Sequence, residues 1–185
     1  MLKSLLDRFA IRPFERAFDY DAGYMRALLA ASPATFLKFS ILTGLVVRRD
    51  APAEALAAAG IVATLREDCG PCTQIGVDIA VRGGVDRAVL RAILAGDEAA
   101  MGDTAALAYR FAQASLDRDL NAADPLRDEI VRRWGQKALV AIALTITTGR
   151  MYPTLKYALG YGKTCSRVTV AGEAAPFERP RLLAA

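Results

Sequence analysis

The sequence predicts an all-α protein. Proline or an Asp, Ser or Thr cap precedes nearly every run of apolar residues with helical spacing, and only one short stretch alternates with the period of a strand. Hydrophobic residues make up 54% of the 185 residues, and much of that share is alanine, the strongest helix former. We therefore expect a helix content above about 60%, well over the average for globular domains.

Four helices are expected in the first part of the chain. A short amphipathic segment of leucines and Phe9 comes first, and Arg12-Pro13 interrupts it. Residues 19–31 form the next helix, and Ser32-Pro33 begins another that continues to about residue 47. Asp50-Ala51-Pro52 then begins a long, alanine-rich helix over residues 53–68.

The remaining helices follow a break at Gly70-Pro71. Pro71 begins a helix over residues 72–82, and shorter helices over residues 85–94 and 103–118 come next, the first ended by Gly96 and the second capped by Asp103-Thr104. Pro125 begins a helix that continues to residue 134. Residues 136–150 are apolar on nearly every side and should form the central helix. Tyr152-Pro153 begins the last helix, and the alternating stretch is residues 167–170.

We expect one domain over residues 18–170, with an amphipathic N-terminal extension over residues 1–17 and a C-terminal tail over residues 171–185. The N-terminus carries charges too early for a signal peptide, and the longest apolar run, residues 138–146, is far short of the ~20 residues that span a bilayer. The expected location is the cytoplasm, without a membrane partner. A net charge of +4 with no aromatics among the arginines predicts no nucleic-acid partner. The surplus of apolar residues favours a homo-oligomer.

The motif Cys69-Gly70-Pro71-Cys72 carries the most chemical information. A C-x-x-C pair can cycle between dithiol and disulfide when one thiol is deprotonated near neutral pH. The Gly-Pro spacer keeps the two sulfurs within bonding range, and the expected helix N-terminus favours the thiolate. The chain contains no histidine, so the usual base is missing.

Four interpretations of the pair compete. Two buried structural cysteines are one, although Gly-Pro at a helix start is an unusual way to fill a core. A zinc site needs four ligands, and only Cys165 and carboxylates remain, so no metal is expected. A thioredoxin needs a strand before the motif, whereas a helix is predicted here. We favour a helical dithiol protein.

These residues resemble a known family. A long helix, a C-x-x-C pair that opens a second helix and Gly83-Gly84-Val85 before a short helix are similar to the alkylhydroperoxidase D-like branch of the carboxymuconolactone decarboxylase superfamily. The stretch over residues 128–160 is also similar, so the resemblance covers about residues 18–160. It implies an all-helical fold, trimers, hexamers or other symmetric assemblies, and reduction of peroxides through the dithiol.

The chain departs from that family at the proton relay. The family pattern has a glutamate twelve residues before the first cysteine and a histidine four residues after the second, and these positions are Ala57 and Gly76 here. Two carboxylates are candidate substitutes: Glu54, one helical turn before Ala57 on the same face, and Glu67, beside the motif. We favour Glu54 as the base. Asp68 and Asp78 are the other nearby carboxylates.

The sequence therefore predicts a thiol-dependent oxidoreductase that reduces small hydroperoxides or disulfides through Cys69 and Cys72, without a cofactor and with an external thiol reductant. The choice of attacking cysteine stays open. Two alternatives also stay open. One is a carboxymuconolactone decarboxylase-like lyase or small-molecule binder that uses the same pocket without the thiols, and the other is a non-catalytic assembly protein.

Overall fold

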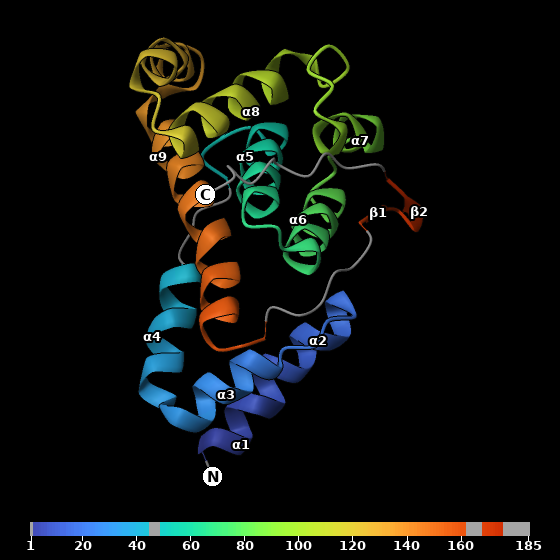
Figure 1. Cartoon of the computed structure of the whole chain (residues 1–185), viewed down its shortest axis with the longest axis vertical. Helices are drawn as coiled ribbons and strands as arrows, with labels where there is room; N and C mark the ends of the chain where they lie inside the picture. The colour runs from blue at the N-terminus through green and yellow to red at the C-terminus, as the bar shows by residue number, and fades with distance from the viewer. Residues whose placement is uncertain (1, 45–48, 162–167, 176–185) are drawn as a thin grey trace.

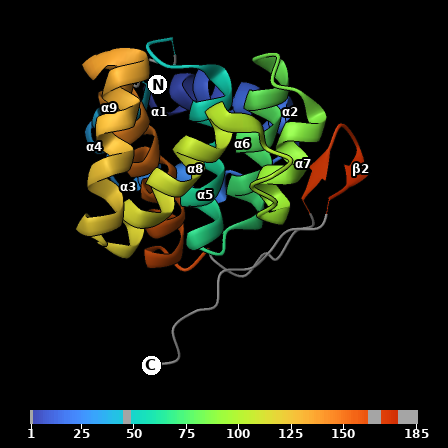
Figure 2. The same cartoon turned by 90° about the horizontal axis from the view of Figure 1, so that it is seen from above.

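The computed structural model describes residues 2–44, 49–161 and 168–175, and 79% of these residues are helical. The prediction of a mostly helical, all-α protein is confirmed. A small antiparallel hairpin of β1 (Thr169–Val170) and β2 (Glu173–Ala174) is the only sheet within the described residues. It lies on the opposite side of the molecule from the longest helix, α9 (Figures 1 and 2).

The first helices form a unit of their own at one end of the molecule (Figure 1). They are α1 (Leu2–Leu6), α2 (Arg12–Phe18), α3 (Gly23–Ala31) and α4 (Pro33–Gly44). A π-helical turn, η1 (Asp7–Ile11), joins α1 to α2, so the expected interruption at Pro13 is wrong. Pro13 falls in the first turn of α2, where its missing N–H costs little, and the wider turn before it accommodates the ring. The unit has its own small core of Ile11, Ala22, Leu29 and Phe36.

The body of the protein is built around α5 (Ala53–Arg66). This helix is buried on all sides, because α6 (Gly70–Arg82), α7 (Arg87–Ala95), α8 (Gly102–Asp117) and α9 (Leu120–Ala158) pack against it. The prediction that residues 136–150 form the central helix is wrong. Val140 and Leu144 in that stretch are 49% and 45% exposed, whereas the small side chains of α5 let four helices approach it.

The chain after Asp119 forms one kinked helix instead of three separate ones. Gly135, with φ 81°, divides α9 into two parts, so the predicted break between residues 134 and 136 is confirmed. The predicted helix starts at Pro125 and Pro153 are wrong, since both prolines lie inside α9. Pro153 removes only the backbone hydrogen bond to the Gly149 carbonyl, and the packing of α9 on α5 offsets that loss.

The tight contact between α5 and α9 depends on glycine. A Cβ atom at Gly149 would lie 3.0 Å from the Cβ of Ala63, and one at Gly60 would lie 3.3 Å from Cγ2 of Thr145. This close approach brings the end of α9 beside the turn between α5 and α6.

Within the described residues, no helix has the length and apolar composition to cross a membrane.

Candidate functional site

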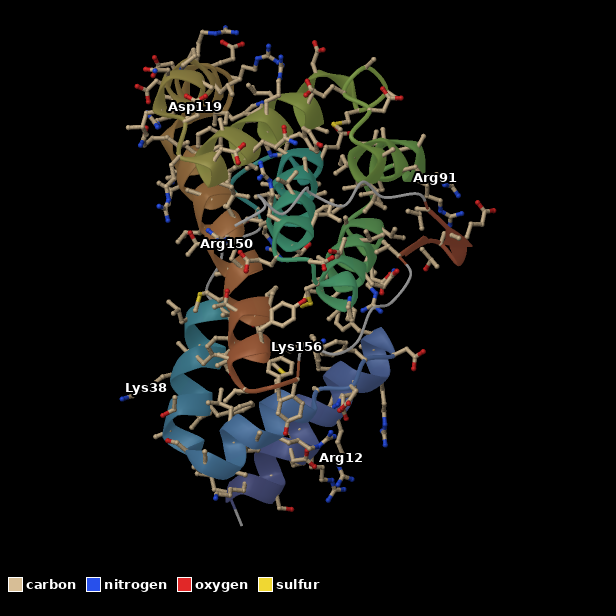
Figure 3. All side chains as sticks on the ribbon, in the orientation of Figure 1. Arg12, Lys38, Arg91, Asp119, Arg150 and Lys156 are labelled. Carbon is tan, nitrogen blue, oxygen red and sulfur yellow. A yellow bond between two sulfur atoms is a disulfide. The ribbon has the colours of Figure 1, made fainter. Side chains whose placement is uncertain are left out.

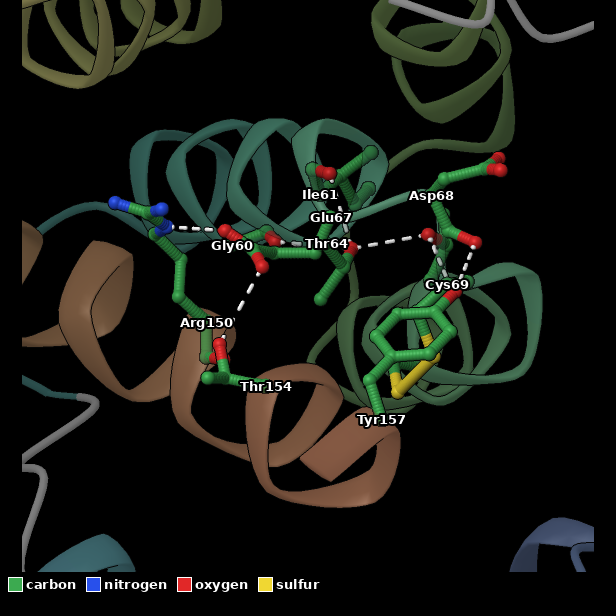
Figure 4. The surroundings of a disulfide bond; sticks show 11 residues. Gly60, Ile61, Thr64, Glu67, Asp68, Cys69, Arg150, Thr154 and Tyr157 are labelled. Carbon is green, nitrogen blue, oxygen red and sulfur yellow. Dashed lines mark hydrogen bonds and ion pairs between the residues drawn. A yellow bond between two sulfur atoms is a disulfide. The ribbon is translucent and has the colours of Figure 1, made fainter. Parts of the chain in front are cut away.

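The C-x-x-C motif forms the turn between α5 and α6 (Figure 4). Asp68 adopts a left-handed conformation, with φ 48°, and reverses the chain after α5. Cys69 is the N-cap residue of α6 and Cys72 lies in its first turn, so both are at the positive end of the helix. A disulfide joins them, with Cα atoms 5.3 Å apart. The predicted pairing is therefore present, while Cys165 lies outside the described residues.

Two buried threonines, Thr64 and Thr73, hydrogen-bond to the backbone of this turn. The Thr73 hydroxyl oxygen lies 3.0 Å from the Thr64 hydroxyl oxygen and 3.0 Å from the Cys69 carbonyl oxygen. The Cys69 N–H donates to the Thr64 carbonyl at 3.3 Å, and the Thr73 N–H donates to the Cys69 carbonyl at 2.9 Å. Residues on α5 and α6 thus fix the backbone on both sides of the first cysteine. No local pattern in the sequence singles out either threonine.

The exposed side of the turn is tied to α9 (Figure 4). Arg150 Nε donates to a Glu67 carboxylate oxygen at 2.5 Å, and the Thr154 hydroxyl lies 3.4 Å from the other oxygen. The Tyr157 hydroxyl donates to the Asp68 carbonyl at 2.9 Å. Glu67 therefore lies beside the motif, as the sequence implies, and forms an ion pair that braces two helices.

The other candidate carboxylates lie elsewhere. Glu54 is in the first turn of α5, and twelve residues of helix place it roughly 18 Å along the axis from the end that precedes the cysteines. Asp78 accepts a hydrogen bond from Gln74 Nε2 at 2.8 Å. The Gln74 amide in turn pairs with the backbone of Thr169 in β1, by bonds of 2.6 and 3.0 Å. The structure thus brings Glu67 to the motif but not Glu54, whose role as a base stays a prediction.

A pocket of about 310 Å³ lies between the N-terminal helices and the body of the protein. Cys72 lines it, and Cys69 does not; the two residues are 8% and 3% exposed. Ala57 and Gly76, the two positions of the family's missing relay, also line it. The volume is at the small end of the range for sites of small organic ligands, roughly 300–1,000 Å³.

The walls of the pocket are apolar apart from hydroxyl groups and the Cys72 sulfur. No Asp, Glu, Lys or Arg is among the described residues that line it. Tyr20 and Tyr24 contribute from the N-terminal helices and Tyr152 from α9. Burial raises the pKa of Tyr20 to about 12 and raises that of Tyr24 as well, so both phenols are neutral over the physiological range. The tyrosines come from distant parts of the sequence, which gave no signal that they meet.

No three Asp, Glu or Cys side chains converge as metal ligands in the described part of the chain. Comparison with protein-family models, with curated proteins and with solved structures finds no match to this chain.

Proposed function

We propose that the protein is a thiol-dependent oxidoreductase that reduces a hydroperoxide bound in the apolar pocket. One observation carries the proposal: Cys72 is both a wall of the pocket and a partner in a disulfide at a helix N-terminus. A thiolate there would meet a bound substrate directly, and the helix N-terminus favours that thiolate. The alkylhydroperoxidase D-like resemblance of the sequence agrees with this chemistry.

The position of Cys72 favours it as the attacking thiol. Its thiolate attacks the O–O bond of the hydroperoxide, takes one oxygen as a sulfenic acid and releases the alcohol after one proton is added. The Cys69 thiol then displaces that oxygen as water and closes the disulfide. An external dithiol returns two electrons and two protons and is itself oxidised. The sum is hydroperoxide plus dithiol giving alcohol, water and disulfide.

The test is hydroperoxide consumption with dithiothreitol as the reductant and cumene hydroperoxide as the substrate. We expect turnover by the wild-type protein and by Cys165→Ser, which leaves the motif intact. Cys72→Ser should abolish turnover. Cys69→Ser, reduced beforehand and then freed of dithiothreitol, should stop after one oxidation and leave a sulfenic acid that dimedone labels at Cys72. Turnover by Cys72→Ser would overturn the proposed role of this thiol.

A small-molecule binder is the second candidate. The observation that favours it is the lack of charged side chains and of both relay residues on the described walls of the pocket. If the reduced wild-type protein consumes no hydroperoxide or low-molecular-weight disulfide yet binds apolar compounds, this function replaces the first.

We also propose that the chain forms a symmetric homo-oligomer. Val140 and Leu144 lie one helical turn apart on α9 and are each nearly half exposed. A groove of about 710 Å³ lies nearby, lined mostly by apolar residues of α4, α8 and α9, including Phe39 and Phe111, and also by polar residues such as Arg150. Leu144→Glu should shift the mass measured by light scattering toward that of a monomer. A monomeric wild-type protein at micromolar concentration would contradict the proposal.

A further inference from the structure

Lys156 is a buried cation without a counter-ion in the described structure. It lies near the end of α9, where this helix meets the N-terminal helices, and it is only 5% exposed (Figure 3). Every other charged residue that the structure describes is at least partly exposed. Its ammonium lies 5.5 Å from the centroid of the Tyr20 ring, and among the described residues it has no hydrogen bond or ion pair.

The nearest compensation for this charge is weak. Burial lowers the pKa of Lys156, and the exposed carboxylate of Asp21 opposes that shift only through its longer-range field. Asp21 accepts a hydrogen bond from the Gly23 N–H at 2.9 Å. A buried ammonium without a partner is costly, and such groups are normally paired.

Lys156 lies just beyond the pocket, on the face of α9 that lines it, and is not itself a wall residue. Thr145, Gly149 and Tyr152 are wall residues, and Lys156 follows Tyr152 by one further helical turn. Its ring partner, Tyr20, is itself a wall residue. The lysine side chain has four rotatable bonds. Rotation about them can move the ammonium from the face of the Tyr20 ring toward the Tyr20 hydroxyl.

Tyr20 supplies a second unsatisfied group at the same place. Its hydroxyl oxygen is fully buried and has no hydrogen-bond partner, the single such side-chain atom in the described structure. The neighbouring Tyr24 phenol interacts with this hydroxyl and partly offsets the rise in the pKa of Tyr20, but the two phenols form no hydrogen bond of normal geometry. A buried hydroxyl without a partner is unfavourable, and a bound acceptor would recover the missing hydrogen bond.

We propose that the pocket binds an apolar molecule that carries one carboxylate, and that this carboxylate accepts hydrogen bonds from the Lys156 ammonium and the Tyr20 hydroxyl. One cation and one phenol match a monoanion, whereas a phosphate would bring a second charge with no partner. The apolar walls suit an alkyl or aryl body. The inference rests on the proposed function for the identity of the pocket and adds the charge of its ligand.

The experiment is isothermal titration calorimetry of the oxidised, full-length protein with octanoate and with 1-octanol, which share a chain and differ in head group. The wild-type protein should bind octanoate at least ~10-fold more tightly than 1-octanol, as expected for a charge-assisted hydrogen bond. Lys156→Met should remove this preference and leave the affinity for 1-octanol within about threefold. Tyr20→Phe should weaken octanoate binding severalfold.

Lys137→Met is the matched control, because Lys137 is an exposed lysine on the same helix. It should change neither affinity. Equal affinity of the wild-type protein for the two compounds, or no binding of either, overturns the proposal, and this comparison needs no variant. A preference that survives in Lys156→Met also overturns it. The turnover assay uses a neutral hydroperoxide, so its failure is separate from failure of carboxylate binding.

Discussion

The hydroxyl groups of Thr64 and Thr73 lie 3.0 Å apart and join the helix before the dithiol turn to the helix after it. Thr73 is fully buried, so its hydroxyl has no water to replace this partner. We expect Thr73→Val, which keeps the shape of the side chain, to lower the free energy of unfolding by ~1–2 kcal/mol. Urea denaturation of the oxidised protein measures this.

Thr147→Val is the control for that experiment. The Thr147 hydroxyl is exposed on α9 and bonds only the Ala143 carbonyl, at 2.9 Å, so its loss should change stability by less than about 0.5 kcal/mol. Equal effects of the two substitutions would show that the contact between the two helices contributes nothing.

The ion pair of Glu67 with Arg150 predicts a structural role for this carboxylate. Glu67→Gln should leave the rate of hydroperoxide reduction unchanged or slightly raised, because the group is engaged by Arg150 and is not a wall residue of the pocket. Half of the Arg150 side chain is exposed, so the stability cost should stay below about 1 kcal/mol. Initial rates and thermal melts give the two values.

Glu54→Gln is the matched comparison for the base. A loss of ~10²-fold in rate confined to Glu54→Gln would assign it that role, as the sequence predicts. The same loss in Glu67→Gln would refute the structural interpretation of the ion pair. Full activity in both variants would leave water or another carboxylate, such as Asp78, as the proton acceptor.

The packing of α9 on α5 predicts a severe effect of substitutions at Gly149. A Cβ added at Gly149 would lie 3.0 Å from the Cβ of Ala63. The two further γ carbons of valine must therefore push the two helices apart. We expect Gly149→Val to lower the free energy of unfolding by about 1–3 kcal/mol or more. Gly44→Ala, at a helical position where a Cβ meets nothing within 4 Å, should be neutral or slightly stabilising. A melting temperature of Gly149→Val equal to that of wild type would contradict the close contact.

The ion pairs of Arg26 predict acid sensitivity of the N-terminal helices. Its guanidinium donates to Glu15 and Asp7 and lowers the pKa of the Glu15 carboxyl; Arg12 and then Arg26 lower that of Asp7. Carboxyl groups whose pKa is lower in the folded state stabilise it above their unfolded pKa. That stability is lost as the pH falls from about 4 through the folded pKa values.

Arg26→Met tests this acid sensitivity. It should lower the melting temperature measured by circular dichroism at pH 7, and the difference from wild type should vanish near pH 2, where the carboxyl groups are protonated. Arg16→Met, at an exposed position of α2, should show no such pH-dependent difference. A constant difference between Arg26→Met and wild type at all pH values would refute the linkage.

Local signals in the sequence predict most helices, because capping and glycine act over a few residues. Asp86 caps α7 through the Ala88 N–H, and Gly96 ends it with φ 69°. Two prolines were misleading: Pro13 falls in a first helical turn, where its missing N–H costs little, and packing outweighs the lost hydrogen bond at Pro153. The central position of α5 was not predicted, since burial on all sides depends on which helices approach it.

The dithiol could be identified from the sequence because its chemistry is local to four residues. The pocket could not be identified from the sequence. Tyr20 and Tyr152 are far apart in the chain and become neighbours only when the N-terminal helices meet α9. Lys156 carries no signal in the sequence, where a lysine near a helix C-terminus is an ordinary surface residue; its burial is a tertiary property.

The pocket lies between two hydrophobic cores that are separate from each other. Phe14 and Tyr20 pack against one core and line the pocket, and Ala57 and Ile61 belong to the other core and line it as well. A molecule bound there would contact both cores. Its binding energy would therefore also stabilise the packing of the N-terminal helices against the body of the protein. We expect the empty protein to lose its N-terminal helices before its body on heating, and the filled protein to melt as one cooperative structure.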